Sequence, residues 1–258
     1  DFEIWTKALF SIPISIPGTP FTHAMNARTR LLSRLKQVLA EDTPMKGGLD
    51  LIRGGVDEVG IPLDDEDLAE QLLLLLFAGY ETTASSLSCL FRALLMNPTV
   101  NTWLLEELDA QSEQEDRDRS LPRLDATVLE VMRLTPPVGG FFRRTKASVM
   151  LAGLEVPAGR VIQVVLTPSS PCDDSDFADF RPQRHLDKSF DQTLLPFGGG
   201  ERVCLGKALA DLEIRLMALG VLKNVDLHLH PNQDLSLQQI PSPTPRDGLV
   251  VAANKKSK

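Results

Sequence analysis

One cysteine stands at the end of a glycine-rich loop, just before an amphipathic helix pattern. The loop covers residues 196–206 (PFGGGERVCLG), and the helix pattern runs from about residue 206 to residue 224. Unpaired backbone N–H groups and the positive end of the helix dipole stabilise an anion at a helix N-terminus, so this position favours the thiolate form of Cys204. A thiolate can act as a nucleophile or bind a metal.

The residues near Cys204 indicate which of these roles its thiolate has. No His–Asp pair stands at a spacing typical of a cysteine nucleophile, and no second Cys or His nearby could complete a zinc or iron–sulfur site. A single thiolate suits the axial ligand of a haem, with the cationic Arg202 free to pair with a propionate. Three consecutive glycines also let the backbone lie against a flat macrocycle. The alternative is a small buried cysteine before an ordinary helix.

The spacing Phe197-x-x-Gly200-x-Arg202-x-Cys204-x-Gly206 matches the haem-binding signature of the cytochrome P450 superfamily, the haem-thiolate monooxygenases. Three further segments resemble family motifs and follow in the family's order: Ala78-Gly79-x-Glu81-Thr82-Thr83, Glu130-x-x-Arg133 and Phe180-x-Pro182-x-Arg184. The resemblance implies haem b as the cofactor. It makes Cys204 the iron ligand and places Phe197, Gly200, Arg202 and Gly206 around the haem.

The resemblance makes Glu81 and Thr82 an acid–alcohol pair that delivers protons during oxygen activation, with Ala78 beside the haem. A threonine hydroxyl in mid-helix can bond to the carbonyl four residues back, which loosens the helix and leaves room for water. Protons could then pass from Glu81 through that water. The alternative is a packed hydroxyl beside a solvated acid.

Glu130 and Arg133 are three positions apart on a predicted helix, where such pairs are usually solvent-exposed and weak. The resemblance instead makes them a buried network with Arg184 that supports the fold and haem retention. It also implies that Arg143, in preference to Arg144, contacts a haem propionate.

The resemblance implies roles in substrate or partner contact for several other residues. A further group of histidines and cysteines has no predicted functional role. Substrate-contact positions would be Phe77, Ala78, Val138, Gly139, Gly140, Phe141 and the turn at residues 240–243. Lys188 and Lys207 are candidates for contact with an acidic electron donor. We interpret His185, His228 and His230 as structural, and Cys89 and Cys172 as incidental thiols. The chain departs from the family pattern at residues 168–171 (PSSP) and at Asp176-Phe177, so we expect the loop that carries Arg184 to be less securely placed than the Cys204 loop.

The elements that must position these residues are mostly helical. Apolar periodicity and capping residues predict helices at about residues 1–10, 22–40, 65–96, 99–114, 125–134 and 206–224. Alternation predicts short strands at about residues 149–151, 154–156, 161–166, 225–230 and 249–253. The helix at 65–96 is apolar nearly all round between residues 72 and 78, which predicts that it crosses the middle of the molecule. The fold class is mainly α with a small β subdomain, the cytochrome P450 fold without its N-terminal helices.

Composition excludes several classes of protein. The 258 residues carry a net charge of −8, which is too acidic for a general nucleic-acid binder. Three scattered cysteines cannot build a disulfide scaffold, so we expect a reducing compartment, on the cytoplasmic side. Because Glu70 and Glu81 bracket the longest apolar run, we expect no membrane span and a chain that is soluble as written, although membrane association stays open.

The resemblance covers residues 1–258 as the C-terminal portion of a single cytochrome P450 domain, from the F/G helix region to the C-terminal strands. The helical pattern already present at Asp1 indicates further sequence ahead of it. The implied function is hydroxylation of a lipophilic small molecule of retinoid, terpenoid or sterol-like type. It uses O2 and electrons from a ferredoxin or an NADPH-dependent reductase. The alternatives are a truncated, non-catalytic fragment and a haem-thiolate isomerase or sensor.

Overall fold

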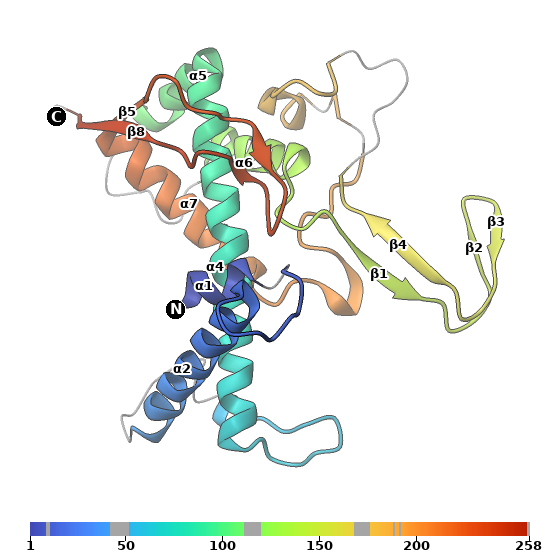
Figure 1. The fold of residues 1–258 in the computed structure, drawn as a ribbon. Helices are drawn as coiled ribbons and strands as arrows, with labels where there is room; N and C mark the ends of the chain where they lie inside the picture. Colours follow the sequence, from blue (N-terminus) through green and yellow to red (C-terminus); the bar gives the residue numbers. More distant parts are fainter. Residues whose placement is uncertain are drawn as a thin grey trace. The chain divides into compact units, whose positions relative to one another are not determined.

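The computed structural model describes residues 1–8, 11–41, 52–110, 120–167, 176–187, 189–190 and 192–256. It divides the chain into two compact units, residues 1–81 and residues 82–258 (Figure 1). The predicted roles of residues 168–171, Cys172 and Lys188 fall outside the described residues, as does most of the loop predicted after residue 110.

The first unit is helical. It contains α1 (Phe2–Lys7), α2 (Pro20–Ala40) and the first half of α4 (Asp65–Met96). Helix α2 begins where Thr19 Oγ1 accepts a hydrogen bond from the backbone N–H of Thr22, and α4 begins where Asp64 Oδ1 accepts two such bonds. The helices predicted at residues 22–40 and 65–96 are thus confirmed. Their shared core consists of Leu32, Leu39, Leu68, Ala69 and Leu73.

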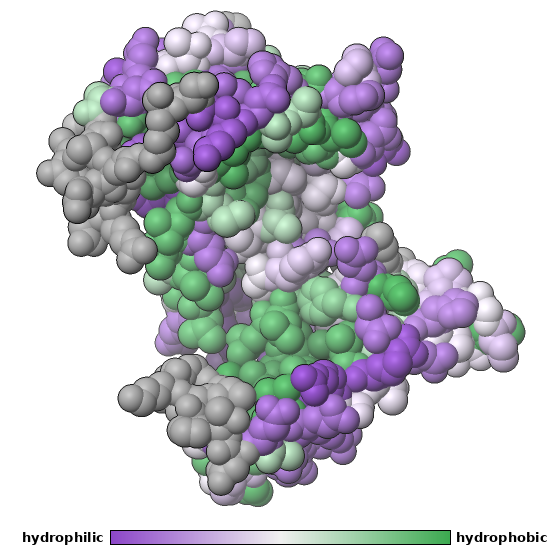
Figure 2. All heavy atoms as spheres, turned by 90° about the vertical axis from the view of Figure 1, so that its left-hand side faces the viewer, coloured by the Kyte–Doolittle hydropathy of each residue, from purple (hydrophilic) through white to green (hydrophobic). Residues whose placement is uncertain are grey.

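Burial of α4 differs from the sequence prediction. Leu73 is 2% exposed, but Leu75, two positions on and nearly opposite on the helix, is 43% exposed. The described residues therefore cover one side of the apolar run, and the prediction that the helix crosses the middle of the molecule stays a prediction. Figure 2 shows other hydrophobic side chains reaching the molecular surface among hydrophilic ones.

The same helix bears on the expectation that the chain has no membrane span. Helix α4 has 32 residues, and its most apolar stretch has a mean hydropathy of 1.3, so it is long and apolar enough to cross a membrane by length and composition. Length and composition alone are weak evidence, since core helices of soluble proteins pass the same test.

The second unit has a helical core. It contains the second half of α4, α5 (Pro98–Asp109), α6 (Pro122–Leu134) and α7 (Lys207–Asn224). Proline at the first helical position starts both α5 and α6, where the missing N–H costs nothing. Leucines dominate the buried core, which includes Leu90, Leu94, Leu104, Leu108, Leu121, Leu124, Ile214 and Leu219.

Four antiparallel strand pairs flank these helices. Strand β1 (Gly140–Arg144) pairs with β4 (Val161–Val165), and β2 (Val149–Leu151) pairs with β3 (Leu154–Val156) at the far end of the same ribbon (Figure 1). Strand β5 (Val225–Leu229) pairs with β8 (Val251–Lys255), and β6 (Leu237–Gln238) pairs with β7 (Thr244–Pro245). The mainly α class with a small β part is confirmed. Strands β1, β6 and β7 were not predicted, because β1 does not alternate and β6 and β7 have only two residues each.

Candidate haem site

The loop before Cys204 is closed by its own backbone. Gly198 N–H donates to Leu195 O at 2.8 Å, and Cys204 N–H donates to Phe197 O at 2.9 Å. Gly198 and Gly200 adopt φ values of +71° and +68°, in the left-handed region that side chains disfavour. Two of the three consecutive glycines are therefore needed by the path of the backbone itself.

Cys204 lies two residues before the N-cap of α7. The N-cap is Gly206, and Lys207 N–H donates to Cys204 O at 3.3 Å. The thiol of Cys204 is free and exposed, whereas the free thiol of Cys89 is buried. The structure therefore places Phe197, Gly200, Arg202, Cys204 and Gly206 in one loop at the start of a helix, as the sequence predicts.

The donor set around Cys204 fits a haem. No group of three or more His, Cys, Asp or Glu side chains comes together among the described residues, so this part of the chain offers a metal one accessible sulfur. A porphyrin suits such a site because it brings its own four nitrogen ligands. The neighbours of the sulfur are also apolar and open, with Val203 48% and Leu205 89% exposed. These side chains could cover a flat hydrophobic macrocycle.

Arg143 is joined to this loop through an aromatic ring. A Cβ placed on Gly198 would lie 3.9 Å from Phe141 Cε1, so the ring lies against the loop. The guanidinium carbon of Arg143 lies 4.2 Å from the centre of the same ring. Arg144 points to the other side of β1 and donates to Gly159 O at 3.2 Å. This geometry supports the choice of Arg143 over Arg144 as the propionate contact.

A buried carboxylate network joins α6 to the segment at residues 181–185. Glu130 Oε2 accepts from Arg133 Nε at 2.7 Å, and Glu130 Oε1 accepts from Arg184 Nε at 3.0 Å. All three side chains are at most 4% exposed. The alternative of a solvent-exposed pair is therefore excluded, and the buried network predicted by the resemblance is present in the structure.

His185 is a further partner that sequence reasoning did not place. Its Nε2 lies 2.7 Å from Glu130 Oε2, and the backbone N–H of Arg181 donates to Glu130 Oε1 at 3.0 Å. Burial by itself raises the pKa of Glu130, but hydrogen bonds from Arg133, His185 and Arg181 bring it down to about 2. Glu130 is thus held as a carboxylate. His185 follows Arg184 directly in the sequence. This position next to the motif was the one sequence feature that could have indicated a contact with Glu130.

The departure at Asp176-Phe177 does not loosen this segment. Arg184 Nη2 donates to Asp176 O at 2.7 Å. The rings of Phe177 and Phe190 lie over the Arg133 guanidinium at 4.8 and 5.6 Å. A phenylalanine at position 177 thus contributes a cation–π contact to this segment. The expectation that the Arg184 loop is less securely placed than the Cys204 loop stays a prediction.

The predicted oxygen-activation residues lie in α4. Ala78 and Glu81 end the first unit, and Thr82 begins the second, which also contains the Cys204 loop. Ser86 Oγ donates to Thr82 O at 3.0 Å, so hydroxyls do bond back to carbonyls along this stretch of helix. The roles of Ala78, Glu81 and Thr82 stay predictions.

Comparison with known proteins decides the family. The family described as "Cytochrome P450" matches residues 23–255. The chain belongs to this family. It is 35% identical to "Putative cytochrome P450 120" of Synechocystis sp. over 97% of the chain and 60% of that protein. It is 30% identical to "Cytochrome P450 26B1" of Danio rerio over 97% of the chain and 54% of that protein.

The solved structures agree with this assignment. The structure titled "Retinoic acid bound cyanobacterial CYP120A1" superposes with a TM-score of 0.86 and 32% identity, over 99% of this chain and 62% of that one. The chain therefore spans 54 to 62% of the length of these cytochromes P450. Members of the family bind haem b, which is the cofactor that the Cys204 loop predicts.

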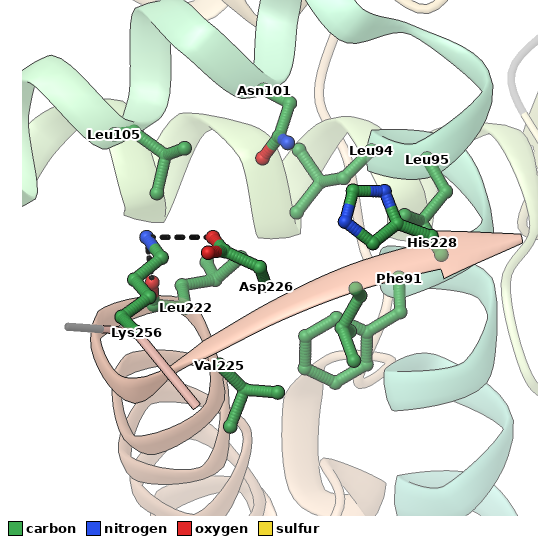
Figure 3. A pocket seen from close by; sticks show the side chains of 11 residues that line it. Phe91, Leu94, Leu95, Asn101, Leu105, Leu222, Val225, Asp226, His228 and Lys256 are labelled. Atoms are coloured by element: carbon green, nitrogen blue, oxygen red, sulfur yellow. Dashed lines mark hydrogen bonds and ion pairs between the residues drawn. The ribbon is translucent and has the colours of Figure 1, made fainter. Parts of the chain in front are cut away.

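This cytochrome P450 chain also has a small pocket away from the Cys204 loop. The pocket has a volume of about 160 Å³ and lies between the end of α4, α5 and β5 (Figure 3). Lys256 lies at its edge, where Nζ donates to Leu222 O at 2.8 Å and lies 3.8 Å from Asp226 Oδ1. None of the predicted site residues lines it.

Proposed function

We propose that the protein containing this chain is a haem-thiolate monooxygenase that hydroxylates a lipophilic small molecule. The observation that carries the proposal is the free, exposed thiol of Cys204 at the end of a loop closed by its own backbone, in a chain that belongs to the cytochrome P450 family. Haem b, when bound, supplies the redox chemistry that splits O2, and electron donation from the sulfur promotes O–O cleavage.

The chain's own residues have three tasks in this proposal. Cys204 would hold the haem iron through its thiolate. Arg143, which stacks on Phe141, and Arg202 would pair with the propionates. Glu81 and Thr82 hold and pass protons on the oxygen side, because a carboxylate can be recharged from solvent while the hydroxyl orients water.

The substrate class proposed is retinoid-like. A structure that superposes on 99% of this chain is that of a cytochrome P450 with retinoic acid bound. An apolar pocket with a few polar groups is the usual design for such lipophilic ligands. Terpenoids and sterols have similar size and polarity and remain alternatives within the same class.

The electron donor proposed is an external protein, either a ferredoxin or an NADPH-dependent reductase. Lys207 is the described candidate for contact with an acidic partner. Its Nζ bonds Asp211 Oδ2 at 2.7 Å and lies 5.3 Å from the centre of the Phe197 ring.

The carbon monoxide difference spectrum of the reduced holoprotein tests thiolate ligation directly. The wild type is expected to show the thiolate-ligated band, and Cys204→Ser is expected to lose it. Cys89→Ser is the matched control and should keep the band, because Cys89 is buried and away from the loop. A band that persists in Cys204→Ser would contradict the proposal.

A second measurement separates a monooxygenase from an isomerase or sensor. Retinoic acid, O2 and a competent NADPH-dependent donor should give a product that has gained one oxygen atom from O2. A haem-thiolate isomerase or sensor would show the same carbon monoxide band without oxygen incorporation from ¹⁸O-labelled O2. A truncated fragment would bind no haem at all.

A further inference from the structure

Three side chains of α4 hold one distant segment of the chain. Ser85 Oγ donates to Pro243 O at 2.7 Å, Cys89 Sγ donates to the same oxygen at 3.2 Å, and Arg92 Nε donates to Leu235 O at 2.6 Å. These residues are four and three positions apart, so they lie on one face of the helix. All of their partners are backbone carbonyls of the β6–β7 hairpin region.

The carbonyl group of Pro243 is buried, and both of its lone pairs accept a hydrogen bond. Ser85 is 0% exposed, Cys89 is 2% exposed and Pro243 is buried. A carbonyl oxygen has two lone pairs, and the hydroxyl and the thiol occupy both. Burial raises the pKa of the Cys89 thiol, so its S–H stays protonated at neutral pH and remains a donor. Without these two groups the carbonyl would be buried and unpaired, which a folded chain avoids.

The anchored segment ends in an exposed apolar turn. Residues 240–243 connect β6 to β7, and Ile240 in this turn is 64% exposed although Ser242 next to Pro243 is 5% exposed. The turn thus has a fixed base and a free tip. The hydrogen bond from Gln238 Nε2 to Thr244 Oγ1 at 2.9 Å closes the hairpin at the base.

The anchor is close to the predicted oxygen-activation threonine. Ser85 follows Thr82 by three residues, which places it on the same side of α4 and about 4.5 Å further along the axis. The position of the 240–243 turn relative to Thr82 is therefore set by the Ser85 and Cys89 contacts.

We propose that Ser85 and Cys89 are positioning residues that fix the 240–243 turn beside Thr82 and thereby limit the size of ligand that fits next to the reaction centre. This rests on the proposed haem-thiolate function, because it takes Thr82 to mark the oxygen side of the haem. Neither residue touches the ligand. Both act through Pro243.

The test uses two azole probes that bind haem iron through the same nitrogen but differ in size. Imidazole is too small to reach past the iron's immediate surroundings, and clotrimazole carries three aromatic rings. In Ser85→Ala/Cys89→Ala, the dissociation constant for clotrimazole, from haem absorbance titration, is expected to change by about fivefold or more, and that for imidazole by less than about twofold.

Matched variants distinguish this role from a general loss of structure. Cys89→Ser keeps a donor at the same place and should behave as wild type. Asn97→Ala removes a side chain just after α4 that bonds Ala93 O at 2.8 Å and not the hairpin, and it should also behave as wild type. If the double variant loses haem, Cys89→Ala alone, which retains the Ser85 bond, is measured in its place.

The outcomes separate the two proposals. Equal changes for both azoles, or no change for either, in a protein that keeps its thiolate carbon monoxide band would overturn the positioning role alone. A wild type without that band would overturn the proposed function. Hydrogen exchange at residues 235–246 measures the anchor without using the haem, and unchanged exchange in the double variant would show that Ser85 and Cys89 do not hold the hairpin.

Discussion

The Glu130 network and the Cys204 loop belong to the same unit, but their functional groups differ in burial and hydrogen bonding. In the network, a buried carboxylate is surrounded by donors from Arg133, Arg184, His185 and the backbone of Arg181. In the loop, the backbone is internally bonded while the thiol is free and open. The difference indicates that the network completes itself within the chain, whereas the loop is built to offer its sulfur to a ligand.

The largest effect is expected from Glu130→Ala. Removing this carboxylate leaves two arginines buried without their anion, and losing one partner of a buried pair costs about 3 to 5 kcal/mol. We expect the denaturation midpoint to fall accordingly and haem to be lost. Glu106→Ala is the matched control, since its pair with Arg123 is solvent-exposed and its removal should cost under about 1 kcal/mol. Equal stability losses in the two variants would contradict the comparison.

Acid should weaken the same network. The pKa of Glu130 is about 2 in the folded chain and 4.5 as a free group, so its ionisation stabilises the folded state above pH 4.5 and the stabilisation is lost as the pH falls towards 2. The difference amounts to about 3 kcal/mol. Urea denaturation of wild type and Glu130→Gln from pH 6 to pH 3 checks this. The stability difference between the two should shrink as the pH falls below 4.5, and a constant difference would show that folding does not lower the pKa of Glu130.

Thr82→Ala should leave both regions intact and change only the chemistry. Without the hydroxyl, proton delivery is expected to fail more often, so the fraction of consumed O2 recovered in product should fall by about tenfold. Simultaneous assays of O2 consumption and product formation measure this coupling. Ser88→Ala, on the same helix, is the control, and unchanged coupling in Thr82→Ala would refute its role.

A smaller effect is expected from replacing Arg143, the predicted propionate contact near the Cys204 loop, and Arg144 is its control. Arg143→Ala removes the cation that stacks on Phe141 beside the loop, and it should weaken haem retention by about 1 kcal/mol. Arg144→Ala removes only an exposed contact to Gly159 O and should have little effect. Rates of haem transfer to apomyoglobin compare the two. A larger effect for Arg144 would reverse the assignment.

The smallest effect should be that of Cys204→Ser on folding. Its side chain is exposed, so the free energy of unfolding of the haem-free protein should change by less than about 0.5 kcal/mol. The same variant should lose the thiolate spectrum. A large loss of stability in the haem-free protein would mean that Cys204 is structural and would remove the contrast with Glu130.

Local pattern predicted most of the helices because each depends on few neighbours. Proline, threonine and aspartate near the starts of α2, α4, α5 and α6 act within one turn, and the long apolar period of α4 needs no partner to be recognised. Strands β6 and β7 depend on anchoring by α4 residues some 150 positions away. No short window of sequence contains that information.

The sequence by itself determined the chemistry on offer, namely one cysteine in a glycine-rich loop before a helix, because loop path and helix start are local properties of the backbone. Only the tertiary structure decided which side chains are buried with hydrogen-bond partners and which stay exposed to solvent. It buried Glu130 among its donors, added His185 to them, placed Arg143 over the Phe141 ring and tied Pro243 to Ser85 and Cys89. Burial and hydrogen bonding depend on residues far apart in the chain, and packing alone brings these together.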